Sequence, residues 1–315
     1  MDLSPSVPMR TRTRTLVAAF LALALTSTLA ACSGSDGATA DDSAERTVEH
    51  AMGTTDVPGD PQRVVVLDTV LLDATMALDV TPVGSAMIAN SESLPDYLGD
   101  EVSEISSVGS ILEPDLEQIA ELEPDLILSA KTRHEDLYDS LSDIAPTVFT
   151  ETSGEGWRDS VSTVGEALNR ATEAETLLED YDSQVAEVRD AIGVEGETAQ
   201  VVRPREAGAF RLYGPDTFTG DVLTDLGFSI PEQDWDDSGI IELSAENADQ
   251  AAADWLFLSD DTSNPELSEE TIDLMKADGG ETYPIEHEVW IAGVGPLGAE
   301  TIVTEVEQIV TDSRD

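Results

Sequence analysis

The chain has a single cysteine, Cys32, so no disulfide can form within it. It has only three histidines (His50, His134 and His287), and no two of them lie at a spacing typical of a metal site. Metal ligands supplied by the protein are therefore not expected, and we predict neither a metal site nor a cofactor.

Basic residues are also scarce, because only Lys131 and Lys276 are lysines. Without residues 1–31 the chain has 65 acidic and 12 basic side chains, a formal charge of −53. A surface this acidic repels nucleic acid, so nucleic-acid binding is excluded. Strong acidity with little lysine also fits a protein that works in high salt, where screening relieves repulsion between the acids.

The N-terminus has the pattern of a targeting segment. Three arginines (Arg10, Arg12 and Arg14) precede the apolar run 16–25, which is too short for a permanent membrane span. Leu29-Ala30-Ala31-Cys32 resembles a bacterial lipobox, in which the cysteine is lipidated; the alternative is an ordinary signal peptide with a stray cysteine. We predict a lipoprotein signal peptide at 1–31 and a lipid anchor on Cys32 at the extracytoplasmic face of the cell membrane. A stretch rich in Ser, Gly, Asp and Thr follows, and we place a flexible tether at 32–58 before a folded region at 59–315.

Two segments 129 residues apart share one pattern. Glu117 is followed eight positions later by Asp125 and the apolar run Leu126–Leu128; Glu246 is followed eight positions later by Asp254 and the run Trp255–Leu258. Each predicts a short helix, a turn and a buried strand. The repeat indicates two α/β lobes of related build.

Strand and helix patterns alternate along the chain, which is typical of parallel sheets covered by helices. From 157 to 192 apolar residues recur at helical spacing without proline, which predicts one helix of about 50 Å. It could be a surface helix of one domain, but a second α/β series follows it, so we favour a bridge. We expect two Rossmann-like lobes, at about 60–152 and 197–312, joined by this long rigid helix.

Signatures of common enzyme sites are absent from the sequence, including Gly-x-Ser-x-Gly, a phosphate-binding glycine loop and His-Glu-x-x-His. The segment Gly293–Gly298 superficially resembles a dinucleotide loop, but it contains a proline, and we interpret it as a turn before the last helix. We expect no catalytic residue. A surface-anchored hydrolase is the rival hypothesis, and it would need His134 or His287 as a base.

Several segments in order resemble the lipoprotein substrate-binding components of iron-siderophore, haem and cobalamin ABC importers. The segments are 61–68, 78–84, 108–117, 124–128, 211–214 and 222–228. The resemblance implies a ligand held between the lobes. It also implies that Glu117 and Glu246, one on each lobe, dock onto arginines of the membrane permease.

Scarce basic residues mark the expected ligand side, because ligands bind at the ends of strands in open α/β sheets. Arg203 and Arg211 adjoin predicted strands, and Arg133 follows another after a short loop. Guanidinium groups suit hydroxamate, carboxylate or catecholate oxygens. Three aromatic residues are predicted to wall the pocket: Tyr213, Trp235 and Trp290. Trp255 and Phe257 are predicted to be core.

These observations predict a monomeric binding protein that delivers a ferric siderophore, preferably of the hydroxamate type, to an ABC permease dimer with its cytoplasmic ATPase. Cobalamin and haem are the alternative ligands.

Overall fold

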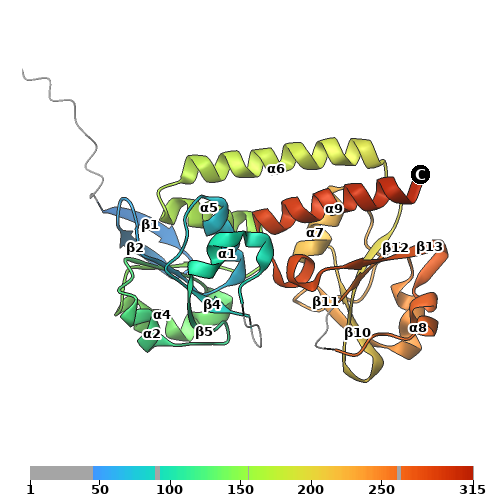
Figure 1. Ribbon diagram of the computed structural model, residues 1–315, viewed down its shortest axis with the longest axis horizontal. Helices are drawn as coiled ribbons and strands as arrows, with labels where there is room; N and C mark the ends of the chain where they lie inside the picture. The colour runs from blue at the N-terminus through green and yellow to red at the C-terminus, as the bar shows by residue number, and fades with distance from the viewer. Residues whose placement is uncertain (1–44, 89–92, 155, 261–263, 315) are drawn as a thin grey trace, which may run out of the picture. The chain divides into compact units, whose positions relative to one another are not determined.

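The computed structural model describes residues 45–88, 93–154, 156–260 and 264–314. The signal peptide at 1–31, Cys32 and the first part of the tether lie outside these ranges. Within them the chain forms two α/β lobes, as expected from the alternating pattern (Figure 1). None of the helices in the described ranges is long and apolar enough to cross a membrane.

Residues 46–57 are folded, so the prediction of a tether up to residue 58 is wrong for this segment. Strands β1 (Arg46–His50) and β2 (Gly53–Val57) pair as an antiparallel hairpin. Val48 and Val57 are buried, and the amide of Ala51 donates to the carbonyl of Phe149, 3.0 Å away. Each strand has few apolar residues, so the sequence pattern of this hairpin is weak.

The N-lobe has a six-stranded sheet in the order β6-β5-β4-β3-β7-β8, parallel except for β6. Its strands are β3 (Val64–Val66), β4 (Gly84–Met87), β5 (Ser106–Ser110), β6 (Glu113–Pro114), β7 (Leu126–Ala130) and β8 (Thr147–Thr150). Its helices are α1 (Thr69–Ala77), η1 (Asp96–Leu98), η2 (Asp100–Glu104), α2 (Leu116–Glu121), α3 (Lys131–His134), η3 (Glu135–Leu137) and α4 (Tyr138–Ser142).

The C-lobe has a five-stranded sheet in the order β11-β10-β9-β12-β13. It is mixed rather than parallel, because β10 runs antiparallel to both of its neighbours. Its strands are β9 (Ala199–Pro204), β10 (Ala209–Tyr213), β11 (Ile240–Ser244), β12 (Ala253–Ser259) and β13 (Lys276–Ile285). Its helices are η4 (Glu206–Gly208), α7 (Phe218–Asp225), η5 (Ala245–Ala251), α8 (Glu269–Leu274), η6 (Glu288–Ala292) and α9 (Pro296–Arg314).

The predicted helix over 157–192 is two helices, α5 (Trp157–Ala167) and α6 (Ala171–Ile192), and only α6 bridges the lobes (Figure 1). Asn169 adopts a left-handed conformation with φ of 59°. The amide of Arg170 donates to Gly165 O (2.7 Å) and that of Asn169 to Glu166 O (3.2 Å). This is a Schellman end, which asparagine tolerates at its left-handed position. With 22 residues α6 is about 33 Å long.

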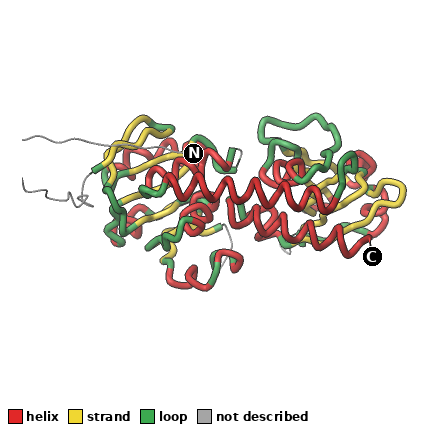
Figure 2. The backbone as a smooth tube through the Cα atoms, turned by 90° about the horizontal axis from the view of Figure 1, so that it is seen from above, coloured by secondary structure: helices red, strands yellow, loops and turns green. Residues whose placement is uncertain are grey.

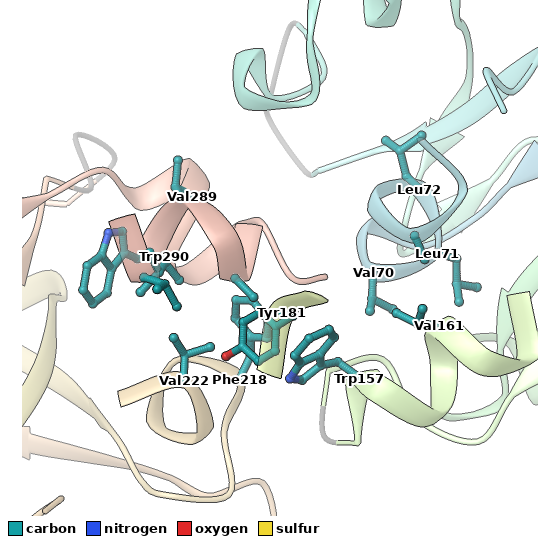
Figure 3. Packing of buried hydrophobic residues seen from close by; sticks show 14 of the residues in the cluster. Val70, Leu71, Leu72, Trp157, Val161, Tyr181, Phe218, Val222, Val289 and Trp290 are labelled. Atoms are coloured by element: carbon teal, nitrogen blue, oxygen red, sulfur yellow. The ribbon is translucent and has the colours of Figure 1, made fainter. Parts of the chain in front are cut away.

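The inner faces of both lobes share one apolar cluster. It runs from α1 through α5, α6 and α7 to α9, and includes Trp157, Tyr181 and Phe218 at the joint (Figure 3). Figure 2 shows α6 lying beside α9 along the molecule. Polar contacts join the same elements, because Asp221 on α7 accepts hydrogen bonds from Trp157 Nε1 (3.0 Å) and Arg158 (2.5 Å) on α5. Shared packing of this kind favours a stiff joint.

Candidate ligand-binding site

A cavity of about 350 Å³ lies where loops of the two lobes face each other. From the N-lobe it is lined by residues that follow the carboxyl ends of β7 and β8, where α/β sheets bind ligands. From the C-lobe it is lined by the turn after β10, the start of β11 and the segment around η6. The lining residues are Thr132, Arg133, Thr152, Ser153, Gly154, Tyr213, Asp216, Thr217, Phe218, Thr219, Ser238, Ile240, Trp290, Ile291 and Val294.

Arg133 lies in the cavity wall. Its Nε donates to Asp68 Oδ2 at 3.1 Å, and its side chain is 44% exposed while that of Asp68 is 1% exposed. Burial raises the pKa of Asp68, and the guanidinium of Arg133 opposes that rise. Asp68 also caps α1 by accepting from Val70 N (3.2 Å). The buried carboxylate therefore fixes one side of the guanidinium and leaves the rest facing the cavity.

Thr219 supplies a hydrogen-bonding group that the sequence did not single out. It lines the cavity and is only 2% exposed, yet its hydroxyl oxygen has no hydrogen-bond partner among the described residues. Buried polar groups are usually paired, and an unpaired one has a free-energy cost. A bound ligand that meets this hydroxyl would remove that cost.

Arginines lie on the cavity side of the C-lobe sheet. Arg211 pairs with Arg203 of β9 and with Glu242 of β11, and side chains two residues apart on a strand share a face. Tyr213 and Ile240, which line the cavity, are therefore on the same face as Arg211 and Glu242. Arg211 Nε contacts Glu242 at 3.2 Å, and Arg205 lies 3.8 Å from the same carboxylate. Glu242 thus contacts two arginines beside the cavity, Arg205 and Arg211.

Tyr213 lines the cavity as predicted and is 7% exposed. Burial raises its pKa, while nearby Arg203 opposes the rise by its charge and by a hydrogen bond. The contact with Tyr213 places the Arg203 guanidinium next to the cavity wall.

The tryptophans are placed differently from each other. Trp290 belongs to the wall but is fully buried. Its ring centroid lies 4.9 Å from that of Phe257, and its Nε1 donates to Glu305 at 2.7 Å. The expectation that its polar edge is free for a ligand is therefore wrong. Trp235 packs over Gly214 and joins the apolar cluster of Val202, Phe210 and Leu212 on the opposite face of the sheet. Its predicted place in the pocket wall is wrong. Trp235 lies in a loop, and the alternation of side chains along a strand does not show which face of the sheet a loop residue covers. Trp255 and Phe257 are core, as predicted.

Glu117 and Glu246 are exposed in the first turns of α2 and η5, which lead into the central strands β7 and β12. The predicted order of helix, turn and strand is confirmed in both lobes. Glu246 follows the carboxyl end of β11, and Glu117 follows the short β5–β6 hairpin at the carboxyl end of β5. Glu117 therefore lies on the carboxyl-end side of the N-lobe sheet, whereas Glu246 lies beyond the end of β11 opposite to Ile240, which lines the cavity.

The two histidines of the hydrolase hypothesis each contact a serine at the end of a central strand. His134 Nδ1 lies 2.7 Å from Ser129 Oγ, and its Nε2 lies 2.6 Å from Ile111 O; both side chains are buried. His287 Nδ1 lies 3.2 Å from Ser259 Oγ. Burial lowers the pKa of His134, and its ring links Ser129 of β7 to the turn that follows β5. Neither serine lines the cavity described above. No three His, Cys, Asp or Glu side chains come together as a metal site in the described ranges.

Comparison with known proteins places the chain. A family model described as periplasmic binding protein matches residues 64–277. The chain belongs to this family. Among its curated relatives in Bacillus subtilis (strain 168), the probable siderophore-binding lipoprotein YfiY is 38% identical over 219 residues, covering 68% of this chain and 67% of YfiY. The Fe(3+)-citrate-binding protein YfmC is 29% identical over 269 residues, covering 83% and 84% of the two chains.

Solved structures with the same fold include two binding proteins whose ligands are named. Staphylococcus aureus SirA complexed with staphyloferrin B is 28% identical, with a TM-score of 0.70 over 84% of this chain and 97% of SirA. The petrobactin-binding protein YclQ of Bacillus subtilis, 23% identical with a TM-score of 0.71, supports the fold alone. The expectation of two α/β lobes with a helical bridge is confirmed.

Proposed function

We propose that the chain is the substrate-binding component of an ABC importer that captures a ferric siderophore and delivers it to the permease. The observation that carries the proposal is the cavity at the strand ends, walled by both lobes and flanked by Arg133, Arg203 and Arg211. It is supported by membership of a family whose relatives are named for siderophore or ferric-citrate binding. The proposed role is binding rather than catalysis.

The cavity chemistry fits an anionic chelate more closely than a bare ion. Arginine donors and the Thr219 hydroxyl suit negatively charged or carbonyl oxygens, whereas Tyr213 and Phe218 suit an apolar surface. In such a complex the chelator supplies the ligands of the iron. Among ferric chelates the hydroxamate class stays our preferred prediction, and cobalamin and haem are the alternatives.

Delivery requires a partner and a location. We propose that Glu117 and Glu246 dock onto the permease dimer, which works with a cytoplasmic ATPase. A monomer anchored by lipid on Cys32 at the extracytoplasmic face would meet that permease at the membrane. The exposure of both glutamates in the first turns of α2 and η5 supports this model, because their carboxylates are accessible to a partner.

A panel of ligands tests the proposal. The purified chain would be titrated with ferrioxamine B, ferric citrate, a ferric catecholate, cobalamin and haem, with calorimetry beside tryptophan fluorescence because these compounds absorb light. We expect saturable binding of at least one ferric chelate, weakened in the Thr219→Val and Arg133→Gln variants. Binding of cobalamin or haem alone would defeat the siderophore assignment. Preference for ferric citrate over ferrioxamine B would defeat only the hydroxamate prediction.

The hydrolase alternative predicts a different result. If His134 or His287 were a catalytic base, replacing it with glutamine would abolish function. Under the binding proposal ferric-chelate affinity should persist in both variants.

A further inference from the structure

A buried carboxylate outside the cavity lining joins the two lobes. Asp73 lies on α1 of the N-lobe and is fully buried. Its Oδ1 accepts from the amide of Leu297 (2.8 Å) and its Oδ2 from that of Gly298 (3.0 Å) in the first turn of α9. Tyr97 donates its phenol proton to the same Oδ2 at 3.0 Å. The last helix is therefore capped by a side chain that comes more than 200 residues earlier.

The capped helix continues directly from the cavity wall. Trp290, Ile291 and Val294 line the cavity, and α9 begins at Pro296. Between them Gly295 has φ of +150°, and a Cβ there would lie 2.5 Å from the Asp73 carboxyl carbon. Only glycine allows this approach. The wall segment is thus held at one end by the contact with Asp73.

Packing alone would not require an acid at this position. A buried carboxylate has a high free-energy cost unless it is fully hydrogen-bonded, and an apolar residue would fill the same space. An aspartate, however, accepts all three donors at once and interacts favourably with the N-terminus of a 19-residue helix. The arrangement therefore favours a role in positioning.

We propose that Asp73 is a positioning residue of the binding cleft: its buried carboxyl group holds the wall Trp290–Val294 against the N-lobe, and loss of its proton loosens that wall. The proposal rests on the binding function proposed above for the cavity.

The change in protonation falls near neutral pH. Burial raises the pKa of Asp73 to about 7, and the hydrogen bonds from Leu297, Gly298 and Tyr97 limit the rise. Glu300 of α9 raises it further by its charge. Glu288 of η6 acts on Tyr97, whose pKa is raised chiefly by burial, so the phenol stays protonated. Two other elements, β3 and α5, also pack on α1, and both contribute valines to the shared apolar cluster. The buried group therefore binds its proton more tightly than it would in water, and the ionised form gains free energy when the contact opens and the carboxylate meets water.

Hydrogen exchange of the ligand-free protein, followed by mass spectrometry, tests this role. Exchange would be measured from pH 8.5 to 5.5 and corrected for intrinsic rates, with peptides covering 294–299 compared with 302–308 in the middle of α9. In the wild-type protein we expect protection of 294–299 to fall about tenfold as the pH rises through about 7, because opening brings the ionised carboxylate into water, while 302–308 changes little.

Variants give the matched control. Asp73→Asn has no ionisable group at this position and should show protection of 294–299 that does not change with pH. Asp79→Asn changes an exposed aspartate just beyond α1 and should behave like the wild type. Constant protection in the wild type across the pH range would overturn the proposal, and so would the wild-type pH profile in a folded Asp73→Asn. If that variant does not fold, the wild-type profile decides alone. Since no chelate is present, the result is independent of whether the cavity binds ferric siderophores.

Discussion

Asp125 and Asp254 make the same contact in the two lobes, each tying a central strand to the start of its parallel neighbour. Asp125 precedes β7 and accepts from the amides of Gln62 and Arg63, both at 2.8 Å, just before β3. Asp254 of β12 accepts from the amide and the hydroxyl of Thr198, both at 2.8 Å, just before β9. In each copy of the sequence repeat the aspartate therefore fixes the strand register. The glutamate of each copy, Glu117 or Glu246, is exposed instead.

Removing either aspartate should weaken the fold without changing the cavity. Asp125→Ala or Asp254→Ala leaves two donors without their acceptor, and we expect each to lower the free energy of unfolding by about 1–3 kcal/mol. Urea titration followed by circular dichroism would measure this. Glu121→Ala, an exposed acid at the end of α2, is the control and should change stability little. An equal, negligible effect in all three variants would contradict the assigned role.

Replacing the exposed glutamates should separate uptake from binding. In Glu117→Ala and Glu246→Ala we expect unchanged affinity for the ferric chelate and loss of cellular iron uptake, because only the contact with the permease is removed. Glu121→Ala and Asp249→Ala alter exposed acids further along the same two helices and serve as controls. A parallel loss of affinity would place the glutamates in the ligand site.

Neutralising the C-lobe arginines should weaken ligand binding. Arg203→Gln or Arg211→Gln should reduce the affinity for an anionic ferric chelate by about 1–3 kcal/mol, the usual effect of losing a charged hydrogen bond. Calorimetry would measure the change. Lys276→Gln removes one positive charge from the same lobe, where Lys276 pairs with Asp273, and should have little effect. If Lys276→Gln weakens binding as much as the arginine variants do, the loss of affinity comes from the change in net charge and not from a contact between these arginines and the ligand.

Asp73 should give stability a defined dependence on pH. Its folded-state pKa of about 7 exceeds its ordinary value of 3.8, so the folded protein holds this proton more tightly than the unfolded chain. The resulting stabilisation is complete below the ordinary pKa and is lost as the pH rises through about 7. The free energy of unfolding of the wild type minus that of Asp73→Asn should therefore decrease between pH 5 and pH 8, by at most about 1.4 kcal/mol per pH unit. A difference that increases over this range would contradict the assignment.

Elements with strong periodic patterns could be predicted from the sequence. The buried strand near Val65, the two Glu-to-Asp segments and the last helix are all present. The long helix was predicted without its break, because Val164, Leu168 and Ala171 keep helical spacing across the turn at Asn169. The asparagine was the available signal, since it favours the left-handed conformation.

Residues of the site could be proposed from the sequence only where they lie on a strand or just after one. Arg133 and Tyr213 lie in the wall, and Arg203 and Arg211 lie beside it. The hydroxyl groups of the wall, Thr219 of α7 among them, come from separate helices and loops that only the folded chain brings together. Trp235 was placed in the wall wrongly, because no periodic pattern tells which face of a sheet a tryptophan in a loop covers.

The shared cluster of the inner faces has a consequence for how the protein unfolds. Each lobe has a separate cluster only on its outer face, around Phe149 in one lobe and Phe210 in the other. The inner faces of the two lobes pack into one apolar cluster through α5, α6 and α9. Heat or urea should therefore melt both halves in one cooperative transition. Either half expressed alone would expose a broad apolar surface and would tend to aggregate.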